Sequence, residues 1–295
     1  MPAQLRKVRQ RIRSVESTMK ITRAFELISA SRVVRATQRV EQARPYTEAV
    51  TTSLSHVAST ETHLSHPLLE RRAEVNAAAV LVVTSDRGLA GPYNANVLRT
   101  TEELLARLRH GGVQPKLYVI GRKGVAYYRF RQRPVAESWI GFSDRPTYDD
   151  AKRAADALIA AFLDHEVDEI HAVFTDFVSA VTQRAVARRF IPLVVEETRE
   201  RPPEPIPMYL FEPGAQEVLY ALLPSYIEAR VFTALLEAAA SEHAARRKAM
   251  SAATDNAEEL IGDLTRQYNQ ARQAAITQEI MEIVGGAEAL RNTGS

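Results

Sequence analysis

The sequence has no cysteine, no long apolar run and no apolar N-terminal leader. The lack of cysteine excludes disulfides, thiolate metal ligands and a cysteine nucleophile, so packing alone has to stabilise the fold. The longest wholly apolar run, 77–83, is far shorter than the ~20 residues that cross a bilayer. The residues after Met1 also lack the apolar core of a secretory signal. These absences predict a soluble cytoplasmic protein.

Glycine and proline are scarce near both ends of the chain. Residues 1–60 contain no glycine and only two prolines, Pro2 and Pro45, and no proline follows Pro224. Apolar residues recur at steps of three and four from Leu5 to Met19, which is the spacing of one helix face. The sequence therefore predicts a long helix at each end, with a kink or break at Pro45.

A compact domain could not bury a helix as long as the C-terminal one. A helix over 225–284 would be about 90 Å long at 1.5 Å per residue. Its seam carries small residues, among them Ala245, Ala249 and Ala252, which favour close contact with another helix. Only the N-terminal helix is long enough to be that partner. The two helices are therefore predicted to pair antiparallel as a coiled coil.

Acidic residues are few in the first helix, although the whole chain has 38 basic and 36 acidic residues. Residues 1–44 contain eleven Lys or Arg and three Glu, a net charge of +8. A basic helix can bind nucleic acid, but here an apolar seam runs through the basic stretch and stacking aromatic residues are sparse. We expect an acidic protein surface as the partner, and no nucleic acid.

The middle of the chain alternates between strand-like and helical patterns. Short apolar runs at 77–84, 116–121 and 169–177 are typical of buried strands, and a helical pattern covers 148–163. This alternation predicts a layered, Rossmann-like α/β domain with a partly parallel sheet. A proline-rich stretch at 201–207 marks its end.

The expected organisation has three parts. They are an N-terminal helix at 1–60, a central α/β domain at 75–208, and a C-terminal helix at 212–290 that pairs with the first.

The sequence matches no known pattern for a phosphate-binding loop, a metal site or a catalytic triad. The turn SDRGLAG at 85–91 follows a strand but matches neither G-x-G-x-x-G nor G-x-x-x-x-G-K-[ST], so a structural turn is expected. His56, His63 and His66 have no acidic cluster at metal-ligand spacing, so no metal is expected. No G-x-S-x-G motif or Ser-His-Asp arrangement is present, which leaves no catalytic candidate. An alternative is a nucleotide- or small-molecule-binding α/β enzyme that is dimerised by its helices.

Motifs near both ends resemble one family. LRKVRQRIRSVESTMKITRAFELISASRVVRA (5–36) and MSAATDNAEELIGDLTRQYNQARQAAITQEIMEIVGGAEAL (250–290) are similar to the two ends of the gamma subunit, the central rotor stalk, of bacterial F-type ATP synthases. SDRGLAGPYN (85–94) and YLFEP (209–213) resemble two further motifs of that family. The departures are conservative: Arg23, Phe25, Ala90 and Pro92 stand where the family often has Lys, Met, Cys and Gly.

The resemblance implies a function as well as a fold. A member of this family is the non-catalytic rotor shaft of the F1Fo ATP synthase. It transmits torque between the proton-driven c-ring and a hexamer of alpha and beta subunits, and so drives the beta subunits through their nucleotide-binding states. The implied partners are one alpha–beta hexamer per chain, the epsilon subunit and the c-ring, with no cofactor and no direct nucleotide binding. The implied location is peripheral, on the cytoplasmic face of the bacterial plasma membrane.

The resemblance also assigns roles to single residues. Those implied to contact the beta subunits are Arg246, Arg272, Gln273, Lys7, Arg9, Arg11 and Phe25. The implied apolar bearing near the C-terminus consists of Ile280, Ile283 and Val284. Those implied to lie at the foot, beside the epsilon subunit and the c-ring, are Arg44, Tyr46, Tyr209 and Glu212.

Overall fold

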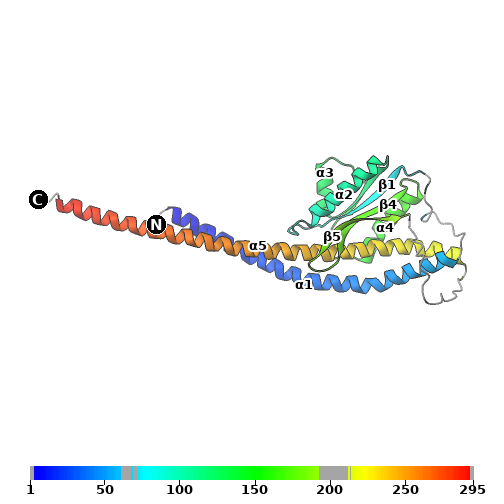
Figure 1. Ribbon diagram of the computed structural model, residues 1–295, viewed down its shortest axis with the longest axis horizontal. Helices are drawn as coiled ribbons and strands as arrows, with labels where there is room; N and C mark the ends of the chain where they lie inside the picture. Colours follow the sequence, from blue (N-terminus) through cyan, green and yellow to red (C-terminus); the bar gives the residue numbers. More distant parts are fainter. Residues whose placement is uncertain are drawn as a thin grey trace. The chain divides into compact units, whose positions relative to one another are not determined.

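The computed structural model describes residues 3–60, 68, 72, 74–192, 212 and 214–292. Two long helices, α1 (Ala3–Thr60) and α5 (Ala215–Asn292), enclose an α/β domain in the sequence (Figure 1). The chain forms two compact units, one from residues 1–28 and 247–295 and the other from residues 29–246. Both long helices contribute residues to both units.

A five-stranded sheet in the order β3-β2-β1-β4-β5 forms the centre of the larger unit. β1 pairs in parallel with both β2 and β4, and β2 pairs in parallel with β3. β4 and β5 form an antiparallel hairpin at one edge. The strands are β1 (Ala77–Val83), β2 (Gln114–Ile120), β3 (Glu137–Trp139), β4 (Glu169–Phe177) and β5 (Gln183–Ile191).

The sheet is covered on both faces, which makes three layers (Figure 1). Ala79, Leu81 and Val83 of β1 pack against α4 (Tyr148–Leu163) and α5. Val80 and Val82 point the other way, against α2 (Tyr93–His110) and α3 (Arg122–Phe130). Because successive side chains of a strand alternate between faces, a strand buried on both faces has to be apolar throughout. This explains the continuous apolar run of β1.

The start of α4 follows from its sequence. Thr147 precedes the first turn, and its hydroxyl accepts a hydrogen bond from the backbone N–H of Asp150. The Asp150 carboxylate in turn accepts the backbone N–H of Thr147 at 2.9 Å. This capping box satisfies N–H groups that a helix start leaves unpaired, and Asp149 and Asp150 suit the positive end of the helix dipole.

Within the larger unit, α5 is a core helix. Leu219, Leu223, Ile227, Val231 and Leu235 recur every four residues and are all buried in the cluster that lines the sheet. By length and composition α5 is also the one helix among the described residues that could cross a membrane. The burial of this face against the sheet accounts for its apolar character.

α1 and α5 run antiparallel and in contact within the larger unit. Val40 packs on Leu236 and Ala240, and the hydroxyls of Thr47 and Thr233 are 3.1 Å apart. Residue numbers rise along α1 as they fall along α5, which fixes the direction.

The smaller unit also pairs the two helices. The hydroxyls of Thr22 and Thr254 lie 2.8 Å apart, and both side chains are buried. Small polar side chains at the contact let the backbones approach closely while their hydroxyls stay satisfied. Long terminal helices with an inserted, mainly parallel α/β domain confirm the fold class predicted from the sequence.

The break expected at Pro45 is wrong, because α1 continues through Pro45 to Thr60. Proline removes one intrahelical hydrogen bond. Pro45 is exposed, so water can satisfy the carbonyl left without its partner, and buried Val40 and Val50 hold the helix on either side.

Candidate functional site

The turn after β1 lies at the carboxyl edge of the sheet. Thr84 and Ser85 are fully buried, and Asn94 in the first turn of α2 accepts the backbone N–H of Ser85 at 2.9 Å. A Cβ on Gly121, in the turn after β2, would lie 2.2 Å from the carbonyl oxygen of Thr84, and Gly121 has φ +96°. Only glycine fits this close approach between the two turns.

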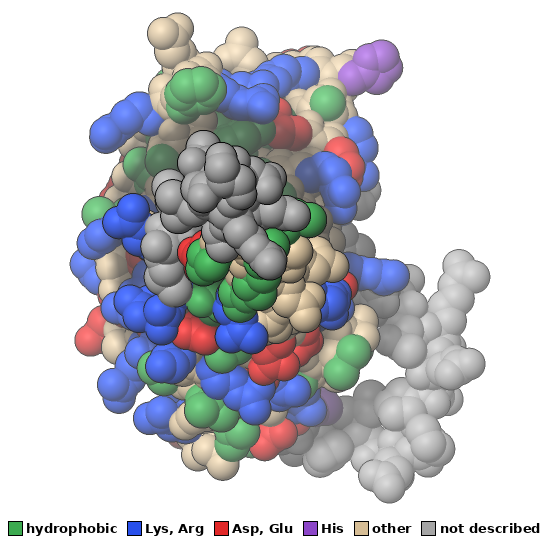
Figure 2. Space-filling model, turned by 90° about the vertical axis from the view of Figure 1, so that its left-hand side faces the viewer, with side chains coloured by type: hydrophobic (Ala, Val, Ile, Leu, Met, Phe, Trp, Pro, Cys, Tyr) green, Lys and Arg blue, Asp and Glu red, His purple; other side chains and the backbone are tan. Residues whose placement is uncertain are grey.

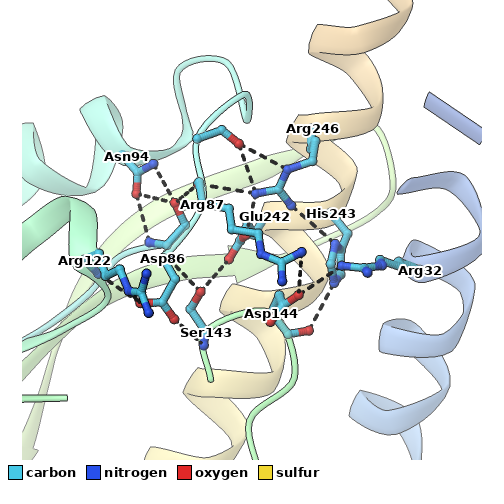
Figure 3. A network of polar contacts seen from close by, with 12 residues as sticks. Arg32, Asp86, Arg87, Asn94, Arg122, Ser143, Asp144, Glu242, His243 and Arg246 are labelled. Carbon is cyan, nitrogen blue, oxygen red and sulfur yellow. Dashed lines mark hydrogen bonds and ion pairs between the residues drawn. The ribbon is translucent and has the colours of Figure 1, made fainter. Parts of the chain in front are cut away.

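Asp86 ties three loops together (Figure 3). Its carboxylate accepts the backbone N–H groups of Arg122 at 3.1 Å, Gly141 at 2.8 Å and Ser143 at 3.1 Å. In open α/β sheets this edge, where the strand order reverses, is the usual place for a ligand. Here the acceptor oxygens of Asp86 are engaged by the chain itself. This supports the structural turn expected from the sequence.

Helix α5 completes the network with buried polar side chains. Glu242 and Arg246 are 1% and 7% exposed and form an ion pair at 2.5 Å. Arg246 also donates to the carbonyl of Gly88 at 3.3 Å, and Ser143 donates to Glu242 at 3.2 Å. Burial raises the pKa of Glu242, and the neighbouring Arg246 opposes that rise. The resemblance assigns Arg246 to the contact with a beta subunit, and in this chain its side chain is buried within the network.

His243 and Arg32 extend the network to α1. The His243 ring nitrogen Nε2 lies 3.1 Å from the carbonyl of Asp144, and Arg32 forms an ion pair with the Asp144 carboxylate at 2.9 Å. Burial lowers the pKa of His243 to about 4, so the ring is neutral near pH 7 and donates to that carbonyl. Both long helices are thereby bonded to the loops of the α/β domain (Figure 3).

The other charged residues assigned to the beta contact lie on the surface of the smaller unit. The side chains of Lys7, Arg9, Arg11 and Arg272 are exposed, and none forms an ion pair with a described residue. Gln273 is exposed as well. These groups keep their hydrogen-bonding capacity for a partner outside the chain.

Apolar side chains are exposed on the same helices. Ile280, Ile283 and Val284, the residues assigned to the bearing, are 55%, 71% and 57% exposed. Ile276 and Met281 are exposed beside them. Neighbouring large apolar side chains left in water mark an interaction surface. Figure 2 views the chain from the side of its termini and shows hydrophobic side chains interspersed with Lys and Arg.

A second exposed apolar stripe lies on α1 and includes Phe25, which the resemblance assigns to the beta contact. Phe25 is 39% exposed, and Ile21 and Ile28 on the same helix face are 55% and 49% exposed. Their spacing of four and three residues places them in one row. The helical spacing of these apolar residues can be read from the sequence. Their exposure cannot, because it depends on which rows of α1 the partner helix α5 covers.

The other assigned residues are scattered. Arg44 and Tyr46 are exposed on α1, and Glu212 is exposed. Tyr209 lies outside the described residues, as do His63 and His66. His56 is half-buried, and no group of three or more potential metal-ligating side chains occurs in the described part of the chain.

The sequence matches the model of a family described as ATP synthase over residues 4–290. It is 61% identical over 300 residues to the ATP synthase gamma chain of Acidothermus cellulolyticus, covering all of both chains. It is 57% identical over 295 residues to that of Frankia casuarinae, covering 98% of this chain and 99% of the relative. Against that of Mycolicibacterium smegmatis it is 54% identical over 304 residues, with 98% and 99% coverage.

Solved structures share the fold at low identity. A chain of the Euglena gracilis mitochondrial ATP synthase (OSCP, F1 and c-ring, rotational state 3) has a TM-score of 0.69 and 14% identity, covering 99% of this chain and 96% of that one. A chain of the Tetrahymena thermophila central stalk and c-ring structure has a TM-score of 0.59 and 21% identity, covering 79% and 99%. These likenesses bear on the fold alone.

Proposed function

Because the chain belongs to the family of ATP synthase gamma chains, we propose that it is the non-catalytic rotor shaft of a bacterial ATP synthase. The shaft transmits torque between a proton-driven c-ring and a hexamer of alpha and beta subunits. The observation that carries the proposal is the 61% identity to a gamma chain along the full length of both proteins.

The mechanism requires a shaft whose faces differ. Each beta subunit meets a different face of the shaft, and a contact that is stronger in one beta conformation shifts the population towards it. Rotation passes each beta subunit through every contact in turn. The smaller unit supports this mechanism, because its two helices expose different side chains, with positive charge and apolar stripes among them.

The contact residues are the exposed polar groups of the smaller unit. Arg272 and Gln273 on α5 meet an acidic lever of a beta subunit, since a guanidinium forms charge-assisted, bidentate bonds with carboxylates. On α1, the residues that contribute to the same beta contact are Lys7, Arg9, Arg11 and Phe25, all of them exposed.

The apolar and foot residues serve the two ends of the shaft. Ile280, Ile283 and Val284 form a nonpolar bearing that turns inside the hexamer without breaking ion pairs. The foot, with Arg44, Tyr46, Tyr209 and Glu212, meets the epsilon subunit and the c-ring. The complex is membrane-associated, with the chain peripheral on the cytoplasmic face.

Co-expression with the alpha and beta subunits of the same bacterium tests the proposal. One copy of the chain should co-purify with three of each, and ATPase activity should depend on its presence. An active alpha–beta hexamer that excludes the chain, or a chain that purifies as a symmetric dimer without them, would overturn the shaft assignment.

A further inference from the structure

The surface of α3 is basic, and none of its residues belongs to the shaft contacts proposed above. Residues 117–136 contain five Lys or Arg and no Asp or Glu, although acidic and basic residues nearly balance in the whole chain. Two of the five are neutralised: Arg133 pairs with Glu102 at 2.6 Å, and Arg122 lies 3.9 Å from Asp86. Lys123, Arg129 and Arg131 are exposed and have no ion-pair partner among the described residues.

Phe130, the last residue of α3, lies between two of these arginines and is 88% exposed. The inner face of α3 is already filled by Gly124 and Tyr128, so the core has no place for this ring. Burial of an exposed phenylalanine side chain is favourable, because it removes a large apolar surface from water. A partner that buries the Phe130 ring would therefore gain binding free energy. Arg129 and Arg131, which flank the ring in the sequence, leave their guanidinium groups available to the same partner.

The patch has a defined geometry. Lys123, Tyr127 and Phe130 are four and three residues apart, which places them on one side of α3, and Arg131 follows Phe130 as the C-cap residue. The Arg131 guanidinium stacks over the Tyr127 ring, 4.4 Å from its centroid. Stacking fixes the plane of the guanidinium, and a planar, oriented guanidinium suits a carboxylate.

The chemistry favours a protein over a lipid surface. Arginine and aromatic residues are the types enriched where protein interfaces gain most of their affinity. Membrane recognition by charge uses clusters of about four to eight Lys or Arg, more than the three available here. We propose that the α3 patch, Lys123, Arg129, Phe130 and Arg131, is a docking surface for an acidic protein segment. Its carboxylates bind Arg129 and Arg131, and an apolar pocket takes Phe130.

Photo-crosslinking in the assembled ATP synthase tests this surface. Phe130 is replaced by photoreactive p-benzoyl-phenylalanine, membranes holding the complex are illuminated, and crosslinked peptides are identified by mass spectrometry. We expect a crosslink to a protein segment rich in Asp or Glu. Reversing Arg129 and Arg131 to Glu should reduce its yield about tenfold, as loss of two charge-assisted contacts predicts.

Matched controls use other exposed positions. The photoreactive residue at Ile140, which is 53% exposed, should not capture the same segment. Reversal of the exposed Arg107 and Arg109 on α2 to Glu should leave the Phe130 crosslink unchanged. Crosslinks only to lipid, no crosslink, or a yield that ignores the charge at Arg129 and Arg131 would overturn the proposal. ATPase activity of the same complexes reports on the shaft function separately.

Discussion

Three buried polar side chains of α5, Glu242, His243 and Arg246, decide how the helix meets the turn after β1. They are surrounded by alanines, so hydrogen bonds and one ion pair replace apolar packing at this point. Their burial could not be predicted from the sequence, because an SEHAAR segment on a long helix reads equally well as a solvated face. The turn after β1 was easier to predict from the sequence, since a strand followed by glycines indicates a turn whatever surrounds it.

Removing the Arg246 side chain should lower the free energy of unfolding. Arg246→Ala leaves the Glu242 carboxylate buried without its counter-charge, which typically costs about 3–5 kcal/mol. Trp139, the one tryptophan of the chain, stacks on Tyr118 in the same unit and reports unfolding in urea by its fluorescence. The neighbouring Arg247 is exposed, so Arg247→Ala should change stability by less than about 0.5 kcal/mol. Equal losses in the two variants would contradict the buried pair.

Glu237 should make stability depend on pH. Burial and the nearby Asp176 raise the pKa of Glu237 from 4.5 to about 7, and Arg188 and Arg230 only partly oppose this. Between these values the folded chain holds a proton that the unfolded chain has lost, so stability falls as pH rises through that range. Glu237→Gln should remove the fall and gain about 1–3 kcal/mol over the natural chain between pH 5 and pH 8. A stability difference that stays constant with pH would refute this role.

At the scale of elements, the apolar patterns identify the long helices, the strands β1, β2 and β4, and the helix α4. β5 is harder, because it is an edge strand with a partner on one side only, and Arg184, Arg188 and Arg189 interrupt its apolar residues. The three-residue β3 is too short for any periodicity. Pro45 misleads for a physical reason, since contacts on both sides of it outweigh one missing hydrogen bond.

The contact between the turn after β2 and the end of β1 should tolerate no side chain. Gly121→Ala places a Cβ 2.2 Å from a backbone oxygen of Thr84, so the two turns must separate and folding of the α/β unit should fail. Gly112 also has a positive φ, but nothing lies within 4 Å of an added Cβ. Gly112→Ala should therefore cost only the backbone strain, about 1–2 kcal/mol. Soluble yield and Trp139 fluorescence would distinguish the two, and a well-folded Gly121→Ala chain would contradict the packing.

The surface of α5 supplies a matched test of the beta contact. Arg272→Ala with Gln273→Ala should lower the ATPase activity of the assembled complex about tenfold, as loss of bonds worth about 1.4 kcal/mol predicts. Arg266 and Gln267 are the same residue types, also exposed, six residues earlier and on another helix face. Their double alanine variant should keep full activity. Equal activities in the two double variants would remove Arg272 and Gln273 from the contact.

For the whole molecule, the fold follows from two facts about the chain. Its terminal helices are long and apolar on one side, so each has to pack against a partner. In the domain between them strands alternate with helices, which favours a layered α/β fold. The family motifs predict the partners, but which exposed groups meet them depends on surfaces that other chains provide. The absence of cysteine offers a direct way to watch the molecule work, since one introduced cysteine gives a unique attachment point.

The decisive measurement is rotation of single molecules. Val181 is 78% exposed at the end of the β4–β5 hairpin, so Val181→Cys accepts a bead while the alpha and beta subunits are fixed to glass. With ATP the bead should turn steadily in one direction, in equal steps, one for each catalytic subunit. A bead that only fluctuates while the same complexes hydrolyse ATP at full rate would show that the chain is not the shaft.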